Sequence, residues 1–444
     1  MDASAHFRGK KITVMGLGLL GRGVGDAKYL AECGAELIVT DPKSAEELAP
    51  SVEALKDFKN ITFVLGEHRL EDFRDRDLIV KTGGIPLDSP YLAEAKKNNI
   101  PVQMSADLFA EYAGIPVIGI TGTRGKSSVT HMIAAVLTAA GKSVLLGGNV
   151  RGISTLALLK DVQGDEIAVL ELDSWQLQGF GDAHISPNIA VFTTFYDDHL
   201  NYYHGDKAAY LADKANIFLN QKEDDLLIMG SQCAGEIQNA YRKQFKGKFE
   251  VWGEHDLPSD WALKIPGAHN RYNAALALAV ARAMKINDSI TKQALADFKG
   301  VPGRLELIRE VGGVKIYNDT TATTPEATIA ALNALAPREG SGKNQNVILI
   351  FGGADKNLDM NQLLVEIPKY TKRVIMLAGT GTNRVLEFLP NASVFDSLSA
   401  AVKEAFAAAQ PGDSILFSPA FASFGMFKNE YDRGDQFNTL TRAL

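Results

Sequence analysis

The sequence predicts an α/β protein built from three domains with parallel strands. Short β-branched runs alternate with Ala- and Leu-rich segments along nearly the whole chain, which is the rhythm of βαβ units. A chain of 444 residues has the length of about three domains. Hydrophobic residues make up 46% and charged residues 22%, close to the average soluble protein.

Charge and cysteine content exclude several classes of function. The net charge of −7 argues against a nucleic-acid partner or an anionic lipid surface. The two cysteines, Cys33 and Cys233, are too few for a disulfide framework or a cysteine-rich zinc site. No uncharged apolar run reaches the roughly 18 residues of a membrane helix, and the polar N-terminus does not resemble a signal peptide. We therefore expect a cytoplasmic protein without membrane insertion.

The first domain is expected at residues 1–112. Its predicted elements are a helix over Gly25–Cys33 and strands at Lys11–Met15, Glu36–Thr40, Ile61–Leu65 and Asp77–Val80. The turn Gly16–Gly21 (GLGLLG) follows the first strand and opens the helix, and Asp41 lies twenty residues beyond Gly21. This is the dinucleotide-binding fingerprint in its proper context, so we expect a Rossmann-like nucleotide-binding domain. The motif does not name the nucleotide, and a tight turn without a ligand is the alternative.

The second domain is expected at residues 113–300. Its predicted strands are Ile115–Ile120, Ser143–Leu146, Ile167–Leu172 and Ile189–Thr193, and its predicted helices are Ser127–Ala140, capped by Gly141, and Asn270–Met284. The segment Thr121–Ser128 (TGTRGKSS) lies between a strand and a helix. Backbone N–H groups of such a loop surround phosphates, its Lys neutralises their charge, and its Ser ligates Mg²⁺. We expect a P-loop ATPase-like domain with a parallel sheet.

The third domain is expected at residues 301–444 and to be Rossmann-like. Its predicted strands are Val314–Tyr317, Asn346–Ile350, Arg373–Leu377 and Ser414–Phe417, with helices between them. Residues Pro337–Asn346 are expected to form an exposed loop.

Ordered segments in all three domains resemble the Mur ligase superfamily. Besides GLGLLG and TGTRGKSS, these segments are Thr82–Gly84, Gly147–Asn149, Leu170–Leu177, Asp197–Asn201, Lys214, Gly267–Asn273, Pro302–Glu306, Tyr317–Thr323, Gly352–Asn357 and Ser418–Asn429. The resemblance implies an ATP-dependent ligase that adds D-glutamate to UDP-N-acetylmuramoyl-L-alanine through an acyl phosphate, in peptidoglycan precursor synthesis. It also implies small-molecule partners only and a monomer.

The resemblance assigns the catalytic positions to four residues. Lys126 would neutralise the β- and γ-phosphates of ATP, and Ser127 and Glu171 would ligate one Mg²⁺. His199 would ligate a second Mg²⁺ together with Lys214, which matches the family's carbamylated lysine. Taken singly, a histidine is more often structural and a helical lysine is more often solvated.

The resemblance also implies three sets of binding residues. ATP would contact Gly122, Thr123, Gly125, Lys126, Ser127, Ser128, His269, Asn270, Asn273, Arg304 and Asp319. The UDP-linked substrate would contact Gly18, Leu19, Asp41, Thr82, Gly83, Gly84, Asn149, Ser174 and Gln176. The incoming amino acid would contact Thr323, Lys356, Ser423 and Phe424, with Lys356 pairing with its side-chain carboxylate.

Three positions depart from the family pattern. Asp173 replaces a serine, and one hypothesis is that its carboxylate strengthens Mg²⁺ binding. Thr321 replaces a lysine and Glu430 an aromatic residue, so a related ligase that adds a different amino acid is an alternative. An NAD-dependent oxidoreductase would explain GLGLLG but not TGTRGKSS. A folylpolyglutamate-synthase-like enzyme would not need the first domain, and a nucleotide-binding scaffold would not need the four catalytic residues.

Overall fold

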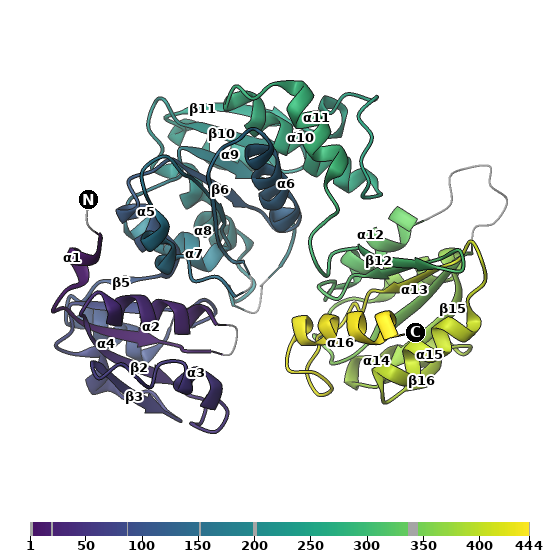
Figure 1. The fold of residues 1–444 in the computed structure, drawn as a ribbon, viewed down its shortest axis with the longest axis horizontal. Coiled ribbons are helices and arrows are strands. Elements are labelled where there is room, and N and C mark those ends of the chain that lie inside the picture. The colour runs from purple at the N-terminus through teal and green to yellow at the C-terminus, as the bar shows by residue number, and fades with distance from the viewer. Residues whose placement is uncertain are drawn as a thin grey trace. The chain divides into compact units, whose positions relative to one another are not determined.

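The computed structural model describes residues 3–18, 21–86, 88–150, 152–198, 202–335 and 345–443. The chain divides into two compact units, one of residues 1–258 with 273–295 and one of residues 259–272 with 296–444. The described residues form three sheets, two in the first unit and one in the second (Figure 1). None of the described helices combines the length and apolar character that a membrane crossing requires.

The first sheet has the strand order β3-β2-β1-β4-β5 with parallel pairing throughout. Its strands are β1 (Lys11–Met15), β2 (Glu36–Asp41), β3 (Ile61–Leu65), β4 (Leu78–Lys81) and β5 (Val102–Gln103). The helices are α1 (Ala3–Phe7), α2 (Arg22–Glu32), α3 (Ala49–Glu53), the 3-10 helix η1 (Leu70–Phe73), α4 (Pro90–Lys97) and α5 (Ser105–Tyr112). The four predicted strands are confirmed to within a residue. The strand order reverses beside β1, which places the GLGLLG turn at the switch point where such sheets bind ligands.

The second sheet has the order β11-β10-β9-β6-β8-β7 and is also parallel. Its strands are β6 (Val117–Thr121), β7 (Val144–Gly148), β8 (Ile167–Glu171), β9 (Ile189–Phe192), β10 (Leu226–Gly230) and β11 (Lys248–Trp252). The elements around it are α6 (Lys126–Ala139), η2 (Leu156–Asp161), α7 (Ser174–Asp182), α8 (Lys207–Leu219), α9 (Ala234–Tyr241), η3 (Arg242–Gln244), η4 (Glu254–Asp256), α10 (Ala268–Ala283) and α11 (Asp288–Asp297). The predicted glycine cap of α6 is confirmed, because Gly141 has φ +73° and donates its N–H to Thr138 O.

The third sheet has the order β12-β13-β17-β14-β15-β16. Its strands are β12 (Glu306–Val311), β13 (Val314–Asn318), β14 (Val347–Gly352), β15 (Thr371–Leu377), β16 (Ser393–Phe395) and β17 (Ser414–Phe417). The helices are α12 (Pro325–Leu335), α13 (Asn361–Tyr370), α14 (Thr380–Val385), η5 (Leu386–Phe388), α15 (Leu398–Ala408) and α16 (Glu430–Ala443). The antiparallel edge strand β12, joined to β13 through Gly312 and Gly313, was not among the predicted strands. Of the predicted loop Pro337–Asn346, residues 337–344 lie outside the described residues.

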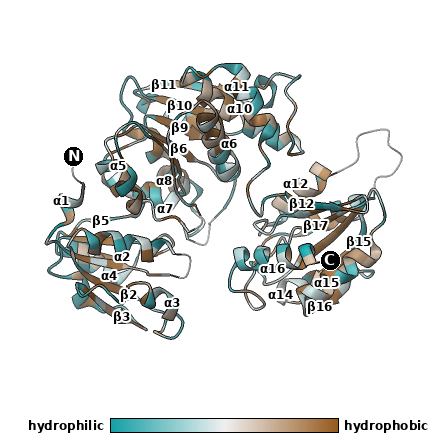
Figure 2. Ribbon diagram, in the orientation of Figure 1, coloured by the Kyte–Doolittle hydropathy of each residue, from teal (hydrophilic) through white to brown (hydrophobic). Residues whose placement is uncertain are grey.

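The cores lie along the strands. All six residues of β14 and all five of β6 are buried. Strands of a parallel sheet are apolar on both faces because crossover helices cover both. Figure 2 shows this as brown strands beneath helices that carry teal on their outer faces. The domain bounds 1–112, 113–300 and 301–444 remain predictions.

Buried carboxyl groups connect the first sheet's helices to the second domain. Ser105 and Ser154 both donate their hydroxyls to Asp26 Oδ1 on α2, each at 2.6 Å. Burial raises the pKa of Asp26 to about 6. On α5, Asp107 is fully buried and accepts the N–H of Met104 at 2.8 Å through Oδ1. Its Oδ2 has no hydrogen-bond partner among the described residues, and burial raises the pKa of Asp107 to about 8.

The raised pKa of Asp107 predicts how the stability of the protein depends on pH. The folded protein retains a proton on this carboxyl up to about pH 8, whereas the unfolded chain releases it near the ordinary pKa of 3.8. Asp107 therefore lowers the free energy of unfolding by about 1 kcal/mol per pH unit as the pH rises through this window. We expect the melting temperature of Asp107→Asn, relative to wild type, to rise steadily between pH 5 and pH 8.

The control is Asp57→Asn, which changes an exposed acid of the same domain. Its melting temperature should follow wild type at every pH. If the difference in melting temperature between Asp107→Asn and wild type does not change with pH, the Asp107 carboxyl titrates normally and the prediction is wrong.

Candidate active site

The loop Thr121–Ser128 connects β6 to α6 and is shaped by two glycines. Gly122 has φ +140° and Gly125, at the N-cap of α6, has φ +86°, both in the region that favours glycine. A Cβ on Gly122 would lie 2.1 Å from Thr193 Oγ1 and 2.8 Å from Thr194 N. The loop can therefore approach the neighbouring strand end only because residue 122 has no side chain.

Hydrogen bonds fix this loop to the residues that follow β9. Thr123 N donates to Thr194 O at 2.7 Å, and Arg124 N donates to Thr194 Oγ1 at 2.9 Å. Thr193 Oγ1 donates to Arg124 O at 2.5 Å. Thr193 and Thr194 were not among the predicted site residues. Their place at the carboxyl end of a predicted strand was the available signal, but only the pairing of β6 with β9 brings them to this loop.

Lys126 and Lys214 converge on one backbone oxygen. Lys126 Nζ donates to Gly122 O at 3.0 Å, and Lys214 Nζ, from α8, donates to the same oxygen at 3.1 Å. The Lys214 side chain is 1% exposed and packs its amine 4.9 Å from the centre of the Tyr210 ring. Burial, followed by the nearby charge of Lys126, lowers the pKa of Lys214 well below its ordinary value. A neutral amine is the form that can react with carbon dioxide.

Ser127 and Glu171 lie at the same edge of the sheet. Ser127 is buried in the first turn of α6. Glu171 ends β8, is 3% exposed, and pairs in register with Ile120 of β6. Mg²⁺ at phosphate sites takes one or two protein oxygens besides phosphates and water, so this hydroxyl and this carboxylate fit it. The described residues contain no cluster of three His, Cys, Asp or Glu side chains suited to a metal, and His199 lies outside them.

In the first domain, Asp41 organises the glycine-rich turn. Its Oδ2 accepts the N–H groups of Leu17 and Gly18 at 2.9 and 3.0 Å, and its Oδ1 accepts that of Lys43 at 2.9 Å. The carboxylate thus folds the loop itself, in addition to any contact with a nucleotide. Leu19 lies outside the described residues.

The predicted Thr82–Gly84 segment follows β4 and packs under the same turn. Thr82 N donates to Met15 O at 3.1 Å, and a Cβ on Gly16 would lie 2.3 Å from Thr82 Oγ1. A Cβ on Gly83 would lie 3.4 Å from the ring of Trp175 on α7. The segment therefore lies between the glycine-rich turn and the second domain.

Asn149, Ser174 and Gln176 lie on the second-domain side of this region. Arg22 donates to Asn149 Oδ1 at 2.6 Å. Gln176 N donates to Asp173 Oδ1 at 2.8 Å and Asp173 N donates to Gln176 Oε1 at 3.1 Å, a reciprocal cap at the start of α7. Asp173 therefore caps α7, a role that a serine also fills. That its carboxylate strengthens Mg²⁺ binding stays a prediction.

Helix α10 carries three of the predicted ATP contacts, His269, Asn270 and Asn273. The boundary between the two compact units falls within this helix, between residues 272 and 273. His269 and Asn270 belong to the second unit, where Asn270 Nδ2 donates to Pro266 O at 2.6 Å. Asn273 belongs to the first unit and is buried, with its Oδ1 2.6 Å from where a Cβ on Gly125 would lie. Asn273 thus lies against the loop Thr121–Ser128, which we call the phosphate loop.

In the second unit, Asp319 is buried behind the Arg304 turn. It accepts the Ser418 hydroxyl at 2.7 Å and the N–H of Leu305 at 2.9 Å, and burial raises its pKa to about 7. Thr321, which replaces a lysine, donates its hydroxyl to Gly303 O at 2.9 Å. Arg304 itself is exposed. The Asp319–Thr321 turn and the Pro302–Glu306 turn therefore support each other.

The predicted amino-acid residues gather at the carboxyl ends of β13, β14 and β17. Lys356 Nζ donates to Thr323 O at 3.4 Å. Ala354 and Ala422 exchange backbone hydrogen bonds, which brings the Lys356 and Ser423 segments together. Ser423 is buried, whereas Phe424 is 70% exposed.

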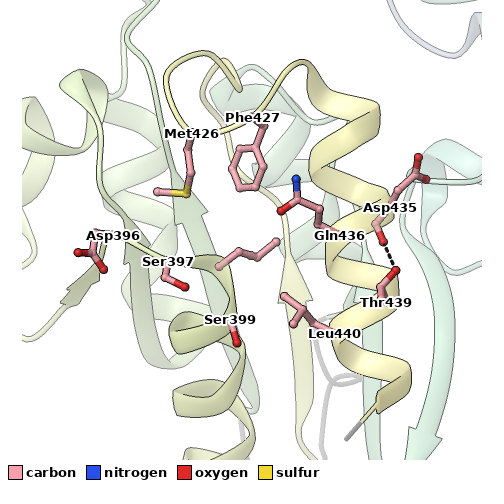
Figure 3. A pocket seen from close by; sticks show the side chains of 10 residues that line it. Asp396, Ser397, Ser399, Met426, Phe427, Asp435, Gln436, Thr439 and Leu440 are labelled. Atoms are coloured by element: carbon pink, nitrogen blue, oxygen red, sulfur yellow. Dashed lines mark hydrogen bonds between the residues drawn. The ribbon is translucent and has the colours of Figure 1, made fainter. Parts of the chain in front are cut away.

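A separate hollow of about 520 Å³ lies between the start of α15 and α16 (Figure 3). Its lining is Asp396, Ser397, Leu398, Ser399, Met426, Phe427, Asp435, Gln436, Thr439 and Leu440. It includes two acids and no base, so it does not suit a phosphate or carboxylate ligand, and it shares no residue with the predicted sites.

The close packing around Gly122 predicts that a side chain at this position weakens ATP binding. In Gly122→Ala, the added methyl group must displace Thr193 and Thr194, so the loop moves by about an ångström. We expect the Kd for ATP to rise about 100-fold while the protein remains folded. Titration calorimetry measures the first and circular dichroism the second.

The matched control is Gly141→Ala. Gly141 also has positive φ, but a Cβ there would meet no atom within 4 Å. This variant should lose about 1 kcal/mol of stability from backbone strain and bind ATP normally. Equal ATP affinity in both variants would contradict the steric role of Gly122.

Comparison with known proteins identifies the family. Three family models match, described as the Mur ligase MurD-like N-terminal domain at residues 10–104, the Mur ligase middle domain at 120–248, and the Mur ligase glutamate ligase domain at 303–421. Among solved structures, the Mur ligases MurC and MurF of Thermotoga maritima superpose with TM-scores of 0.64 and 0.59 at 18% identity each. The MurC match covers 98% of this chain and 99% of that one, and the MurF match covers 99% and 97%. The three-domain α/β fold is thereby confirmed.

Curated relatives match over nearly the whole chain. A protein of Roseiflexus sp. is 36% identical, with 98% of this chain and 99% of the relative covered. A protein of Borreliella burgdorferi is 35% identical with 97% of each covered, and one of Streptococcus sanguinis is 35% identical with 98% of each covered. All three are named UDP-N-acetylmuramoylalanine–D-glutamate ligase. The alternative of an NAD-dependent oxidoreductase is therefore wrong. The chain belongs to the Mur ligase family, together with these D-glutamate ligases.

Proposed function

We propose that this protein joins D-glutamate to the L-alanine carboxylate of UDP-N-acetylmuramoyl-L-alanine, with hydrolysis of ATP to ADP and phosphate. The observation that carries the proposal is the full-length similarity to relatives named for this reaction. The phosphate loop, with Lys126 and Lys214 on one carbonyl oxygen, supplies matching chemistry. The protein acts in peptidoglycan precursor synthesis, and its use of ATP and a UDP-linked substrate supports a cytoplasmic location.

The reaction needs charge neutralisation and positioning more than covalent catalysis by the protein. The substrate carboxylate attacks the γ-phosphorus of ATP and ADP leaves, which forms an acyl phosphate. The amine of D-glutamate then attacks the acyl carbon, and the tetrahedral intermediate loses phosphate and a proton to give the amide. Lys126 and the backbone N–H groups at the start of α6 stabilise the charge on the transferring phosphoryl group.

Mg²⁺ is the metal that this donor set suits. Ser127 and Glu171 would hold one ion, and His199 with a carbamate on Lys214 would hold a second. When bound, the ions neutralise phosphate charge. Glu171 is almost fully buried beside β6, so it presents a fixed carboxylate to that position.

The remaining residues divide between the two substrates. In the first domain, Gly18, Leu19, Asp41 and Thr82–Gly84 bind the uridine diphosphate, while Asn149, Ser174 and Gln176 orient the acyl end. In the third domain, Lys356 pairs with the side-chain carboxylate of glutamate, and Thr323, Ser423 and Phe424 surround it. His269, Asn270, Asn273, Arg304 and Asp319 complete the ATP site. The partners are small molecules, and the protein acts as a monomer.

A ligase assay tests the reaction. We expect phosphate release from ATP only when Mg²⁺, UDP-N-acetylmuramoyl-L-alanine and D-glutamate are all present. L-glutamate should give no release, because its amine is placed on the wrong side when its carboxylates are bound. Release with another amino acid would retain the ligase chemistry and contradict the specificity, with Thr321 and Glu430 as the positions to exchange. No release with any amino acid would contradict the ligase function.

The Lys214 carbamate can be observed directly. After incubation with ¹³C-bicarbonate at neutral pH, we expect a carbamate resonance in wild type that Lys214→Met lacks. The turnover of Lys214→Met should fall about 10²- to 10³-fold, the size expected for losing one electrostatic contribution. Lys207→Met is the control, because this lysine of the same helix is exposed and paired with Asp197 at 3.2 Å. A carbamate resonance that survives in Lys214→Met would assign the modification elsewhere.

A further inference from the structure

The side-chain amide of Gln178 joins three parts of the fold that are distant in sequence. Gln178 lies on α7 and is half-buried. Its Oε1 accepts a hydrogen bond from Lys81 Nζ, at the end of β4, at 3.3 Å. Its Nε2 donates to Asp213 Oδ2 on α8 at 2.7 Å and to Tyr202 Oη at 3.3 Å. One amide thus contacts a strand of the first domain and two segments of the second.

Only one orientation of this amide satisfies both charged neighbours. An ammonium group can only donate hydrogen bonds, and an ionised carboxylate can only accept them. The carbonyl oxygen of Gln178 must therefore face Lys81, and its NH₂ group must face Asp213. Tyr203 Oη donates to the same Asp213 Oδ2 at 2.9 Å, which holds the carboxylate in place. Neither a carboxylate nor an apolar side chain at position 178 could make both contacts.

Lys81 depends on Gln178 for its hydrogen bonding. The lysine is 9% exposed, and among the described residues its amine forms no ion pair and one hydrogen bond, the one to Gln178. Burial lowers the pKa of Lys81, and the charges of nearby acids, Asp107 first, oppose this shift. Loss of the Gln178 amide would therefore leave a buried amine without an acceptor.

The contacts of Gln178 fall on both ends of the segment Thr82–Gly84, to which we assign the UDP-linked substrate. Lys81 directly precedes this segment, and Ile85 directly follows it. Ile85 O accepts a hydrogen bond from Tyr202 Oη at 3.2 Å, so the same amide reaches this end through one hydroxyl. Two of the three residues in the segment are glycines, which restrain the backbone little. The anchored ends therefore set its position.

Asp213 connects the same network to the buried lysine of α8. It directly precedes Lys214 in the helix. The ring of Tyr203, whose hydroxyl donates to Asp213, lies 5.2 Å from the ring of Tyr210, and the Lys214 amine lies 4.9 Å from the centre of that second ring. The substrate segment and the Lys214 side chain thus share one support.

We propose that Gln178 is a positioning residue for the UDP-linked substrate, because its amide, oriented by Asp213, holds both ends of the Thr82–Gly84 segment. This inference rests on the proposed function, since it deepens the substrate site of that reaction. It predicts a selective effect on the UDP-linked substrate, because the phosphate loop is held by its own hydrogen bonds to Thr193 and Thr194.

Ligand binding measured by calorimetry tests the proposal. Gln178→Met keeps the length of the side chain and removes its polar atoms. We expect its Kd for UDP-N-acetylmuramoyl-L-alanine to rise about tenfold, the effect of losing about one hydrogen bond at each end of the segment. Its Kd for ATP with Mg²⁺ should equal that of wild type. An unchanged Kd for the UDP-linked substrate overturns the proposal, and so does an equal loss of affinity for ATP.

Gln178→Asn provides a second route to the same comparison. Its amide is one methylene group too short to reach all of its partners, so the same selective loss is expected. This variant carries the test if Gln178→Met does not fold. A folded Gln178→Asn protein with wild-type affinity for the UDP-linked substrate overturns the proposal.

A double variant separates positioning from stability. Gln178→Met leaves the buried amine of Lys81 without an acceptor, so its melting temperature should fall. In Lys81→Met combined with Gln178→Met this amine is absent, so the melting temperature should recover while Kd for the UDP-linked substrate stays raised. If affinity recovers together with the melting temperature, Gln178 serves stability alone and the proposal is overturned.

Gln103→Met is the matched control. Gln103 lies on the edge strand β5 of the first domain and donates to Glu111 Oε2 at 2.9 Å, in an exposed glutamine–carboxylate pair. This variant should bind both ligands as wild type does. A loss of affinity for the UDP-linked substrate equal to that of Gln178→Met would overturn the assignment to Gln178.

The two levels of inference fail separately. A wild type that binds the UDP-linked substrate but does not join D-glutamate contradicts the proposed function and leaves the Gln178 comparison valid. A wild type that joins D-glutamate, with Gln178→Met binding the UDP-linked substrate normally, contradicts only the Gln178 proposal. A wild type that does not bind the UDP-linked substrate overturns both.

Discussion

The carbonyl of Gly122 is the point on which the nucleotide side of this protein depends. It accepts hydrogen bonds from two lysines that lie 88 residues apart, Lys126 of α6 and Lys214 of α8. The carbonyl is available because Gly122 adopts φ +140° against the end of β9, where any side chain would collide with Thr193. The backbone conformation of Gly122 thus holds the loop against the end of β9 and provides the carbonyl oxygen that both Lys126 and the buried Lys214 contact.

Burial also decides the chemistry of three titratable groups in different parts of the chain. Lys214, Asp107 and Asp319 all have pKa values moved toward the neutral form because folding removes them from water. For Lys214 the neutral form is a nucleophilic amine beside a phosphate loop. For Asp107 and Asp319 it is a carboxylic acid that packs within a domain, at a cost to stability that grows with pH. Burial therefore favours a reactive amine at Lys214 and lowers the stability of the fold at Asp107 and Asp319.

The two parallel sheets of the first unit explain why the candidate sites lie where they do. Each sheet reverses its strand order beside a central strand, β1 in one and β6 in the other. A glycine-rich turn follows each of these strands, so both turns open at the carboxyl edge where a ligand can enter. The hydrogen bonds from Ser105 and Ser154 to Asp26 join the two domains beside the first turn. The substrate site proposed in the first domain and the phosphate site proposed in the second thereby belong to one compact unit.

The sequence determined the elements whose information is local. Predicted strands such as Lys11–Met15 and Ser414–Phe417 coincide with β1 and β17, because buried parallel strands are short apolar runs between turn residues. The antiparallel strand β12 was not predicted, because its sequence ELIREV contains three charged residues and no continuous apolar run. The glycine-rich motifs also located the two turns that join β1 to α2 and β6 to α6, since their spacing encodes local backbone geometry.

Tertiary structure decided what the individual side chains do. Asp41 folds the turn through three backbone N–H groups, and Asp173 caps α7. Thr193 and Thr194 support the loop Thr121–Ser128 only because β9 pairs with β6, and the pKa of Lys214 is lowered only because the fold buries its amine there. A sequence records which groups are present and how far apart they are along the chain. The desolvation and partners that set their charge arise from contacts between residues distant in sequence, so they exist only in the folded protein.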